Sequence, residues 1–250
     1  MNVRITVIAN QKGGIGKTTT ANQLSAGLRV KGYSVLTIDI DPQGNLSHTM
    51  RANTNVGGVF EVLNGEPIDQ LIQRTAQGDI LASSVHLSGA DKKFADYGAE
   101  YSLSKALKSL TEKYQYIIID SPPQLGILTI NTLIAATDLI IPLTADLYAF
   151  MGLSQLLNTV DRVREHSNAK LCISGLLLTR YNSRAILNRD LKESITAKAS
   201  EIGSKLYNTI IRENIAIREA QINRQNIFEY APNSNAAADY NEFINEYLEE

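Results

Sequence analysis

A glycine-rich segment that follows directly on an apolar run constrains this chain more than any other feature. The apolar run spans residues 3–9, and it leads into Asn10-Gln11-Lys12-Gly13-Gly14-Ile15-Gly16-Lys17-Thr18-Thr19-Thr20, which opens an amphipathic stretch. Such a turn between a buried strand and a helix aims several backbone N–H groups at one point, and the helix N-terminus adds partial positive charge. The sequence therefore predicts a loop that binds the phosphates of a nucleotide.

The side chains of this loop supply groups that a triphosphate and its metal ion need. Lys17 is placed to reach the β- and γ-phosphates, and the Thr18 hydroxyl to bind Mg²⁺. The usual pattern G-x-x-x-x-G-K-[ST] would begin with glycine at position 11, but this chain has Gln11 there, followed by Lys12. We expect Lys12 to turn away from its own phosphates and to neutralise those of a nucleotide held by a facing subunit. The predicted nucleotide-binding residues of the loop are Lys12, Gly13, Gly14, Ile15, Gly16, Lys17, Thr18 and Thr19.

The spacing of apolar runs predicts the fold class. With 250 residues, 44% of them hydrophobic, the chain can bury the core of one α/β domain over residues 1–250. Strand-like runs at 3–9, 34–39, 116–120, 139–142 and 171–178 are short, continuous and rich in Val and Ile. Helical patterns occur at 17–31, 102–113, 126–136, 152–165, 188–201 and 236–248. This alternation predicts a mostly parallel twisted sheet with helices on both faces.

Composition excludes several classes of protein. Cys172 is the only cysteine, which rules out an intrachain disulfide and a cysteine-bound iron–sulfur or zinc centre. The net charge of −2 argues against a chain that coats nucleic acid with its whole surface. No apolar run approaches the length of a membrane span, and no basic leader precedes an apolar core, so we expect a cytoplasmic protein.

Two acids stand where strands are expected to end, at the edge where open α/β sheets collect their ligands. Asp41 follows the run at 34–39 and precedes Pro42, which places it at the mouth beside the phosphates. We expect it to orient and activate the attacking water near the metal ion. Asp120 ends the run at 116–120 and is expected to hold a water bound to Mg²⁺. The predicted metal-site residues are Thr18, Asp41 and Asp120, and the predicted catalytic residues are Lys12, Lys17 and Asp41.

Basic residues outnumber acidic ones between positions 180 and 224. The cations are Arg180, Arg184, Arg189, Lys192, Lys198, Lys205, Arg212, Arg218 and Arg224, against Asp190, Glu193, Glu201, Glu213 and Glu219. Cations that neutralise phosphates give sequence-independent, salt-sensitive affinity for DNA. We expect a DNA-binding edge here, with Arg184 and Arg218 as its leading contacts and Arg189 as a third; the alternative is an ordinary solvated helix face.

Three motifs resemble the signatures of the ParA/MinD deviant-Walker ATPases. They are Lys12-Gly13-Gly14-Ile15-Gly16-Lys17-Thr18-Thr19, Asp39-Ile40-Asp41-Pro42-Gln43-Gly44-Asn45 and Asp120-Ser121-Pro122-Pro123, and the second is most similar to the ParA/Soj branch. Further similar segments at 125–131, 175–181 and 211–220 extend the resemblance over nearly the whole chain. The resemblance implies that Arg212 and Asn214 contact the adenine, although the family often has Pro-Arg-Asn where this chain has Arg212-Glu213-Asn214.

The resemblance also implies a function. Family members hydrolyse ATP slowly with Mg²⁺, close into a homodimer on ATP, bind double-stranded DNA without sequence preference and are released when a ParB-like centromere-binding protein stimulates hydrolysis. We therefore expect a plasmid or chromosome segregation ATPase associated with the nucleoid. Because the glycine-rich loop lies so close to Met1, we expect no N-terminal DNA-reading domain.

Other functions share the loop and remain as alternatives. A MinD-like, membrane-associated regulator of the division site needs a basic amphipathic tail, whereas residues 241–250 are acidic and would be repelled by anionic lipid. Nitrogenase-reductase-like relatives need cysteine ligands, which one cysteine cannot supply. Biotin-pathway ligases, tyrosine autokinases and a non-catalytic nucleotide sensor are further possibilities, and the acids Asp41 and Asp120 argue against the sensor.

Overall fold

A seven-stranded sheet forms the centre of the computed structural model, which describes residues 3–181 and 187–249. The strands lie in the order β3-β4-β2-β5-β1-β6-β7. Every neighbouring pair is parallel except β3 and β4, which form an antiparallel edge hairpin. Their bounds are β1 (Arg4–Ile8), β2 (Val35–Asp39), β3 (Ile72–Thr75), β4 (Gly78–Leu81), β5 (Tyr116–Asp120), β6 (Asp138–Leu143) and β7 (Cys172–Leu178). The predicted fold class, a mostly parallel sheet with helices on both faces, is confirmed.

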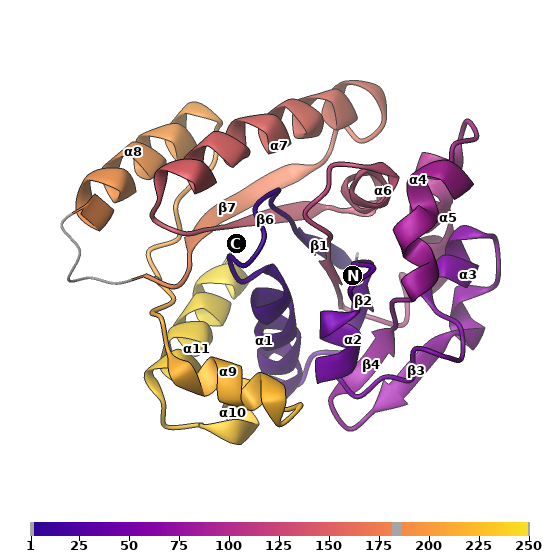
Figure 1. The fold of residues 1–250 in the computed structure, drawn as a ribbon, viewed down its shortest axis with the longest axis horizontal. Coiled ribbons are helices and arrows are strands. Elements are labelled where there is room, and N and C mark those ends of the chain that lie inside the picture. The colour runs from indigo at the N-terminus through magenta and orange to yellow at the C-terminus, as the bar shows by residue number, and fades with distance from the viewer. Residues whose placement is uncertain (1–2, 182–186, 250) are drawn as a thin grey trace.

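Helices cover the two faces of the sheet in separate groups (Figure 1). One face carries α3 (Val59–Leu63), α4 (Ala90–Lys93), α5 (Ser102–Leu107), α6 (Ile127–Ala135), α7 (Leu147–His166) and α8 (Leu187–Glu201). The other carries α1 (Lys17–Val30), α2 (Asn45–Thr49), α9 (Ile215–Ile222), α10 (Ile227–Tyr230) and α11 (Asn235–Leu248). Parallel strands need such crossover connections, which explains why both faces are covered.

The strands divide their side chains between two cores by simple alternation. Ile117 and Ile119 of β5 join the core under α5–α7, whereas Ile118 between them joins the core under α1 and α11. Val7 and Ile8 of β1 divide in the same way. Because successive residues of a strand face opposite sides, a strand buried on both faces must be apolar throughout, which is the pattern of the predicted runs.

The C-terminal helix is part of the core. Tyr240, Phe243, Ile244 and Tyr247 of α11 are buried against α1, which lies beside it in Figure 1. A Cβ on Gly27 of α1 would lie 2.1 Å from the Ile244 side chain, so the two helices approach as closely as they do only because residue 27 is glycine. The apolar residues near the chain end therefore stabilise the fold rather than form an exposed amphipathic face.

The sequence predicted most elements but not all. Predicted helices at 17–31, 126–136, 188–201 and 236–248 match α1, α6, α8 and α11 closely. Two differ in length, because α5 stops at Leu107 before a 3₁₀ turn and α7 begins at Leu147 rather than Gly152. The hairpin β3–β4 and the short helices α2, α3, α4, α9 and α10 were not predicted, because segments this short carry little periodicity.

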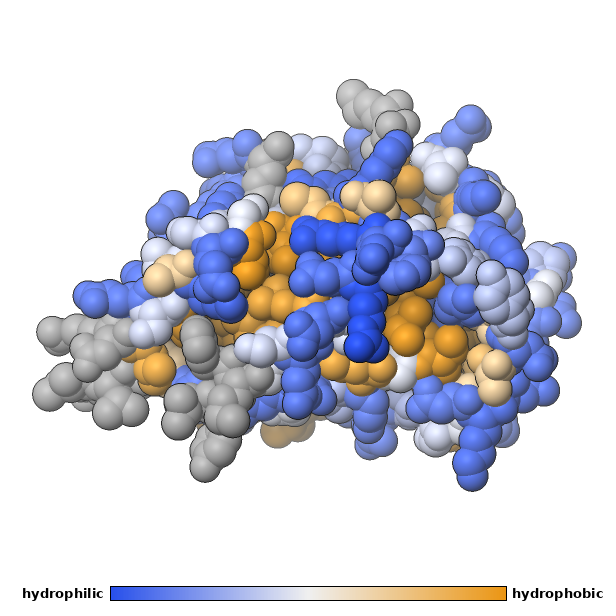
Figure 2. Space-filling view, turned by 90° about the horizontal axis from the view of Figure 1, so that it is seen from above, coloured by the Kyte–Doolittle hydropathy of each residue, from blue (hydrophilic) through white to orange (hydrophobic). Residues whose placement is uncertain are grey.

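The surface carries both apolar and hydrophilic side chains. Figure 2 shows the face that carries α7 and α8 at the top of Figure 1, where apolar side chains gather centrally among hydrophilic ones. Within the described part of the chain, no helix has the length and apolar content needed to span a bilayer.

Candidate nucleotide-binding site

The glycine-rich loop links β1 to α1 in a conformation that only glycines adopt easily. Gly14 has φ 73° and Gly16 has φ 92°, both in the left-handed region. Gly16 occupies the N-cap of α1 and supplies no capping side chain, which leaves the first N–H groups of this 14-residue helix available to an anion. The loop is also held by the Thr179 hydroxyl, which donates a hydrogen bond to the Ile15 carbonyl at 2.6 Å.

Lys17 folds back onto its own loop. Its Nζ donates to the Lys12 carbonyl at 3.0 Å, and the residue is only 7% exposed. Burial lowers the pKa of Lys17, while the nearby carboxylates of Asp120 and Asp41 partly oppose the shift. The ammonium is therefore surrounded by the loop and by acids, which is where the phosphates of a nucleotide would be neutralised.

The predicted acid Asp120 lies beside Asp39, because β2, β5 and β1 are neighbours and end at the same edge of the sheet. The other predicted acid, Asp41, is close enough to raise the pKa of both by its charge. Asp39 and Asp120 are partners in the parallel register of β2 and β5, and both are fully buried. Burial raises the pKa of Asp120 well above its usual range, and the charge of Asp39 raises it further. Burial also raises the pKa of Asp39, to about 6.

Asp120 is incompletely satisfied. Neither of its carboxylate oxygens has a well-formed hydrogen bond within residues 3–181 and 187–249. The neighbouring Thr18 hydroxyl and Lys17 ammonium lower the pKa of Asp120, but burial outweighs them. A buried, unsatisfied carboxylate is costly, and a divalent cation with its waters is the usual remedy. The hydroxyl of Thr18 and the carboxylate of Asp120 therefore fit a Mg²⁺ ion bound with a nucleotide.

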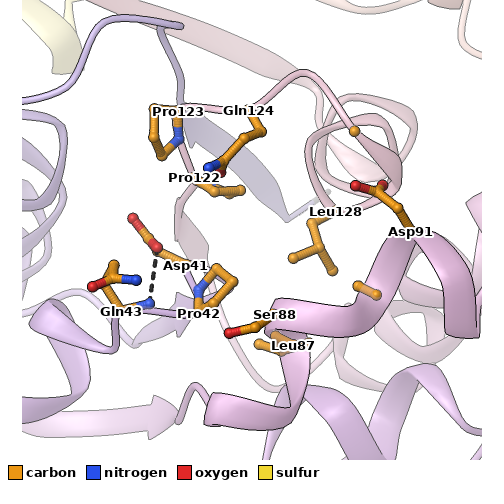
Figure 3. A pocket seen from close by; sticks show the side chains of 12 residues that line it. Asp41, Pro42, Gln43, Leu87, Ser88, Asp91, Pro122, Pro123, Gln124 and Leu128 are labelled. Atoms are coloured by element: carbon orange, nitrogen blue, oxygen red, sulfur yellow. Dashed lines mark hydrogen bonds between the residues drawn. The ribbon is translucent and has the colours of Figure 1, made fainter.

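Asp41 lies between two cavities. It is 8% exposed, and its Oδ1 accepts a hydrogen bond from the Gln43 N–H at 3.0 Å. The first cavity, of about 410 Å³, is lined by the glycine-rich loop and Asp41. The second, of about 500 Å³, is lined by Asp41 together with residues of the 85–91 segment and Pro122. Figure 3 shows the second cavity, with the Asp41 carboxylate directed toward Pro122 and Pro123.

Lys12 pairs with an acid that lies outside the glycine-rich loop. Its Nζ donates to both carboxylate oxygens of Asp146, at 2.7 and 2.6 Å, and the Lys12 side chain is 33% exposed. Asp146 also accepts a hydrogen bond from the Thr144 hydroxyl at 2.5 Å. Asp146 could not be found from the sequence, because it lies 134 residues from Lys12 and the adjacency of β1 and β6 brings the two together.

The segment expected to contact the adenine lines the far end of the first cavity. Arg212 donates from Nε and Nη2 to Asp239 of α11, at distances down to 2.5 Å, so its guanidinium is already oriented. Asn214 caps α9, with its Oδ1 accepting from the Ala216 N–H at 2.9 Å. Further lining residues were not assigned roles from the sequence; they are Thr179, Arg180, Glu213, Ile217, Gln221 and Tyr240.

The predicted DNA contacts fall in different environments. Arg218 is exposed but also lines the first cavity, and its Nη2 donates to Glu213 at 3.2 Å. The same Glu213 oxygen accepts from Arg180, which also donates to the Gly14 carbonyl at 2.8 Å. Arg184 lies outside the described residues, and Arg189 lies in α8 with a side chain that is not described. Part of the basic excess is therefore paired internally.

Comparison with known proteins places these features in a family. A family model described as an AAA domain matches residues 3–173. The chain is 38% identical over 244 residues to the sporulation initiation inhibitor protein Soj of Bacillus subtilis (strain 168), with 95% of each chain covered. It is 36% identical over 246 residues to the chromosome-partitioning ATPase Soj of Thermus thermophilus, covering 98% of this chain and 96% of that protein. The chain belongs to the Soj/ParA family of partitioning ATPases.

Solved structures agree with this assignment. A plasmid partition protein from Borrelia burgdorferi bound to AMPPNP superposes with a TM-score of 0.84 at 26% identity, covering 99% of both chains. Cobyrinic acid a,c-diamide synthase from Mycobacterium smegmatis with bound ATP analog and magnesium gives a TM-score of 0.82 at 33% identity, covering 98% of this chain and 94% of that one. The fold is that of the P-loop NTPases of the ParA type.

The buried charge of Asp120 leads to a prediction about stability. We expect Asp120→Asn to raise the free energy of unfolding of the nucleotide-free protein by about 1–3 kcal/mol, because an uncharged amide is less costly to bury. Thermal melting should rise by roughly 2–4 °C per kcal/mol, while the further rise on adding ATP and Mg²⁺ should disappear. The control is Asp138→Asn, which removes the carboxylate that pairs with Arg4 at 3.1 Å and should lower the melting temperature. A less stable Asp120→Asn protein would contradict the prediction.

Proposed function

We propose that this chain is an ATPase that segregates a plasmid or a chromosome, and that it alternates between a nucleotide-free chain and an ATP-bound homodimer on DNA. The observation that carries the proposal is the buried, unsatisfied Asp120 beside a glycine-rich loop with two lysines. That combination makes the site incomplete until a triphosphate and a cation bind together, so that nucleotide controls the state of the protein.

Different residues of the first cavity bind the nucleotide and promote its hydrolysis. The backbone N–H groups of the loop and the Lys17 ammonium bind the phosphates, and the Thr18 hydroxyl and the Asp120 carboxylate would hold Mg²⁺. When bound, Mg²⁺ would neutralise charge that develops on the phosphates. Asp41 orients the attacking water and accepts its proton, while Arg212 and Asn214 bind the base. Positioning and charge neutralisation of this kind supply most of the catalysis in phosphoryl transfer.

Lys12 connects hydrolysis to dimerisation. In the single chain its ammonium is balanced by Asp146. When two ATP-bound chains face each other, Lys12 exchanges this partner for the phosphates of the nucleotide in the facing subunit. A half-exposed ion pair contributes little to stability, about 1 kcal/mol or less, so a more highly charged triphosphate can replace it.

The dimer is then able to bind double-stranded DNA without sequence preference. Arg218 lies at the mouth of the nucleotide cavity, and Arg184 and Arg189 belong to the same basic stretch. One copy of this edge offers few phosphate contacts, and two copies in one dimer raise the affinity through effective concentration. A ParB-like centromere-binding protein stimulates hydrolysis and releases the dimer, so that the protein works in the cytoplasm on the nucleoid.

A MinD-like role at a membrane has less support. It would require an exposed apolar face on the C-terminal helix, whereas Phe243, Ile244 and Tyr247 of α11 are buried in the core. The acids Glu246 and Glu249 near the chain end would also be repelled by anionic lipid.

The role of Asp41 is tested by Asp41→Ala. We expect ATP affinity to be retained, because the phosphate-binding loop is untouched, while hydrolysis falls by roughly 10²-fold or more. The variant should therefore accumulate as a dimer on DNA in the presence of ATP and Mg²⁺, measured by ATPase assay and by co-sedimentation with duplex DNA. Normal turnover in this variant would remove Asp41 from the mechanism.

The role of Lys12 is tested by sedimentation with a non-hydrolysable ATP analogue. Wild-type protein should shift from monomer to dimer, and Lys12→Ala should stay monomeric while still binding the analogue. Lys31→Ala is the matched control, because Lys31 is an exposed lysine at the opposite end of α1 from the loop. Dimerisation of Lys12→Ala at wild-type affinity would contradict the proposed contact across the interface.

The role of Arg218 is tested by nonspecific DNA binding over a range of salt concentrations. Arg218→Ala should weaken binding and reduce the slope of log affinity against log salt by about one for each chain. Arg74→Ala on β3 removes the same charge from the far edge of the sheet and should leave binding unchanged. Because Arg218 also lines the nucleotide cavity, ATP affinity is measured in parallel. Unchanged DNA affinity would contradict the proposal, and a loss of ATP affinity alone would assign Arg218 to the nucleotide instead.

A further inference from the structure

Asp41 must be held still to act on a water molecule, yet it lies two residues beyond the end of β2. The last sheet hydrogen bond on this side joins the Ile40 N–H to the Asp120 carbonyl at 3.1 Å. Pairing within the sheet therefore does not fix the backbone of Asp41 itself.

Side chains and a turn fix that backbone instead. The Asp41 N–H donates to Asp39 Oδ1 at 3.2 Å, and its carbonyl accepts from the Gly44 N–H at 2.9 Å. The Ser83 hydroxyl donates a second hydrogen bond to the same carbonyl. Both backbone polar groups of Asp41 are thus held, the N–H by a carboxylate and the carbonyl by a backbone N–H and a hydroxyl.

These groups belong to one closed network. The Ser47 N–H and Ser47 Oγ both donate to Asp39 Oδ2 at 2.7 Å, and Ser47 Oγ accepts from the Ser83 N–H at 2.8 Å. Ser47 and Asp39 are fully buried, and Ser83 is 2% exposed. Hydrogen bonds to a buried charge are short and strong, and a fully satisfied buried network specifies one geometry.

The network crosses from one strand to another without entering the nucleotide cavity. Ser83 follows β4 and Ser47 lies in α2, and neither residue lines that cavity. Asp41, by contrast, lines both cavities, and the turn at 85–89 that follows Ser83 forms a wall of the second one (Figure 3). Ser83 therefore contacts the backbone of Asp41 from outside the nucleotide cavity.

We propose that Ser83, together with Ser47, is a positioning residue for ATP hydrolysis, which holds the backbone of Asp41 so that its carboxylate stays aimed at the attacking water. This inference rests on the proposed role of Asp41. A displacement of about 1 Å at a catalytic group costs on the order of 10²-fold in rate. The phosphate contacts of residues 13–18 do not depend on the network, so nucleotide affinity does not depend on it either.

The test compares Ser83→Ala with wild-type protein and with Asp41→Ala. Single-turnover hydrolysis should slow by roughly 10- to 100-fold in Ser83→Ala, while the affinity for a non-hydrolysable ATP analogue stays at the wild-type value. Ser84→Ala is the matched control, because its hydroxyl accepts only from the His86 N–H among the described residues, and it should hydrolyse ATP normally.

A fourth variant separates a lost hydrogen bond from a lost atom. Ser83→Cys fills the space with a somewhat larger sulfur atom but is a weak donor, so its rate should remain low, whereas restored activity would show that filling the space is enough. A normal rate in Ser83→Ala together with an inactive Asp41→Ala would overturn this inference and leave the proposed function standing. A normal rate in Asp41→Ala would instead reject the proposed role of Asp41.

Discussion

Buried negative charge at the carboxyl edge of the sheet is the constraint on which the rest of the site depends. Asp39 and Asp120 end neighbouring strands in register, and both are fully buried. Ser47 and the Asp41 N–H satisfy Asp39, whereas Asp120 has no well-formed hydrogen bond in the described chain and is only partly stabilised by Thr18 and Lys17. Burying this acid without full hydrogen bonding lowers the stability of the fold, which is expected where stability is given up for function.

The cations of the site are likewise engaged before any ligand arrives. Lys17 donates to the backbone of its own loop, Lys12 pairs with Asp146, and Arg212 pairs with Asp239. These interactions differ in what they allow. The Arg212 pair involves a nearly buried carboxylate and orients a planar guanidinium, whereas the half-exposed Lys12 pair can be exchanged at low cost. A fixed group suits recognition of a base, and an exchangeable one suits a contact made only in a dimer.

Internal pairing also changes how the basic stretch is understood. Counting charges along residues 180–224 indicates an excess of cations, but Glu213 binds both Arg180 and Arg218 through one oxygen. Arg180 is tied in turn to the Gly14 carbonyl of the phosphate-binding loop. Arg180 and Arg218 are therefore connected to the loop, so the DNA contacts proposed for this edge would share residues with the nucleotide cavity. Sequence composition cannot reveal such sharing, because it depends on which side chains the fold brings within 3–4 Å.

The sequence by itself determined the fold class and the position of the glycine-rich loop, and it predicted Lys17, Thr18, Asp41 and Asp120 as one site. It could do so because local rules suffice: strands buried on both faces are apolar throughout, and parallel strands end at one edge. The tertiary structure alone decided the partners of those residues, namely Asp146 for Lys12, Asp239 for Arg212, and Ser47 and Ser83 for the Asp39–Asp41 segment. The Lys12 and Arg212 partners lie 134 and 27 residues away, and the bonds of Ser83 depend on β4 being placed beside β2. Strand order and helix packing bring such groups together, and neither leaves a periodic signal in the chain.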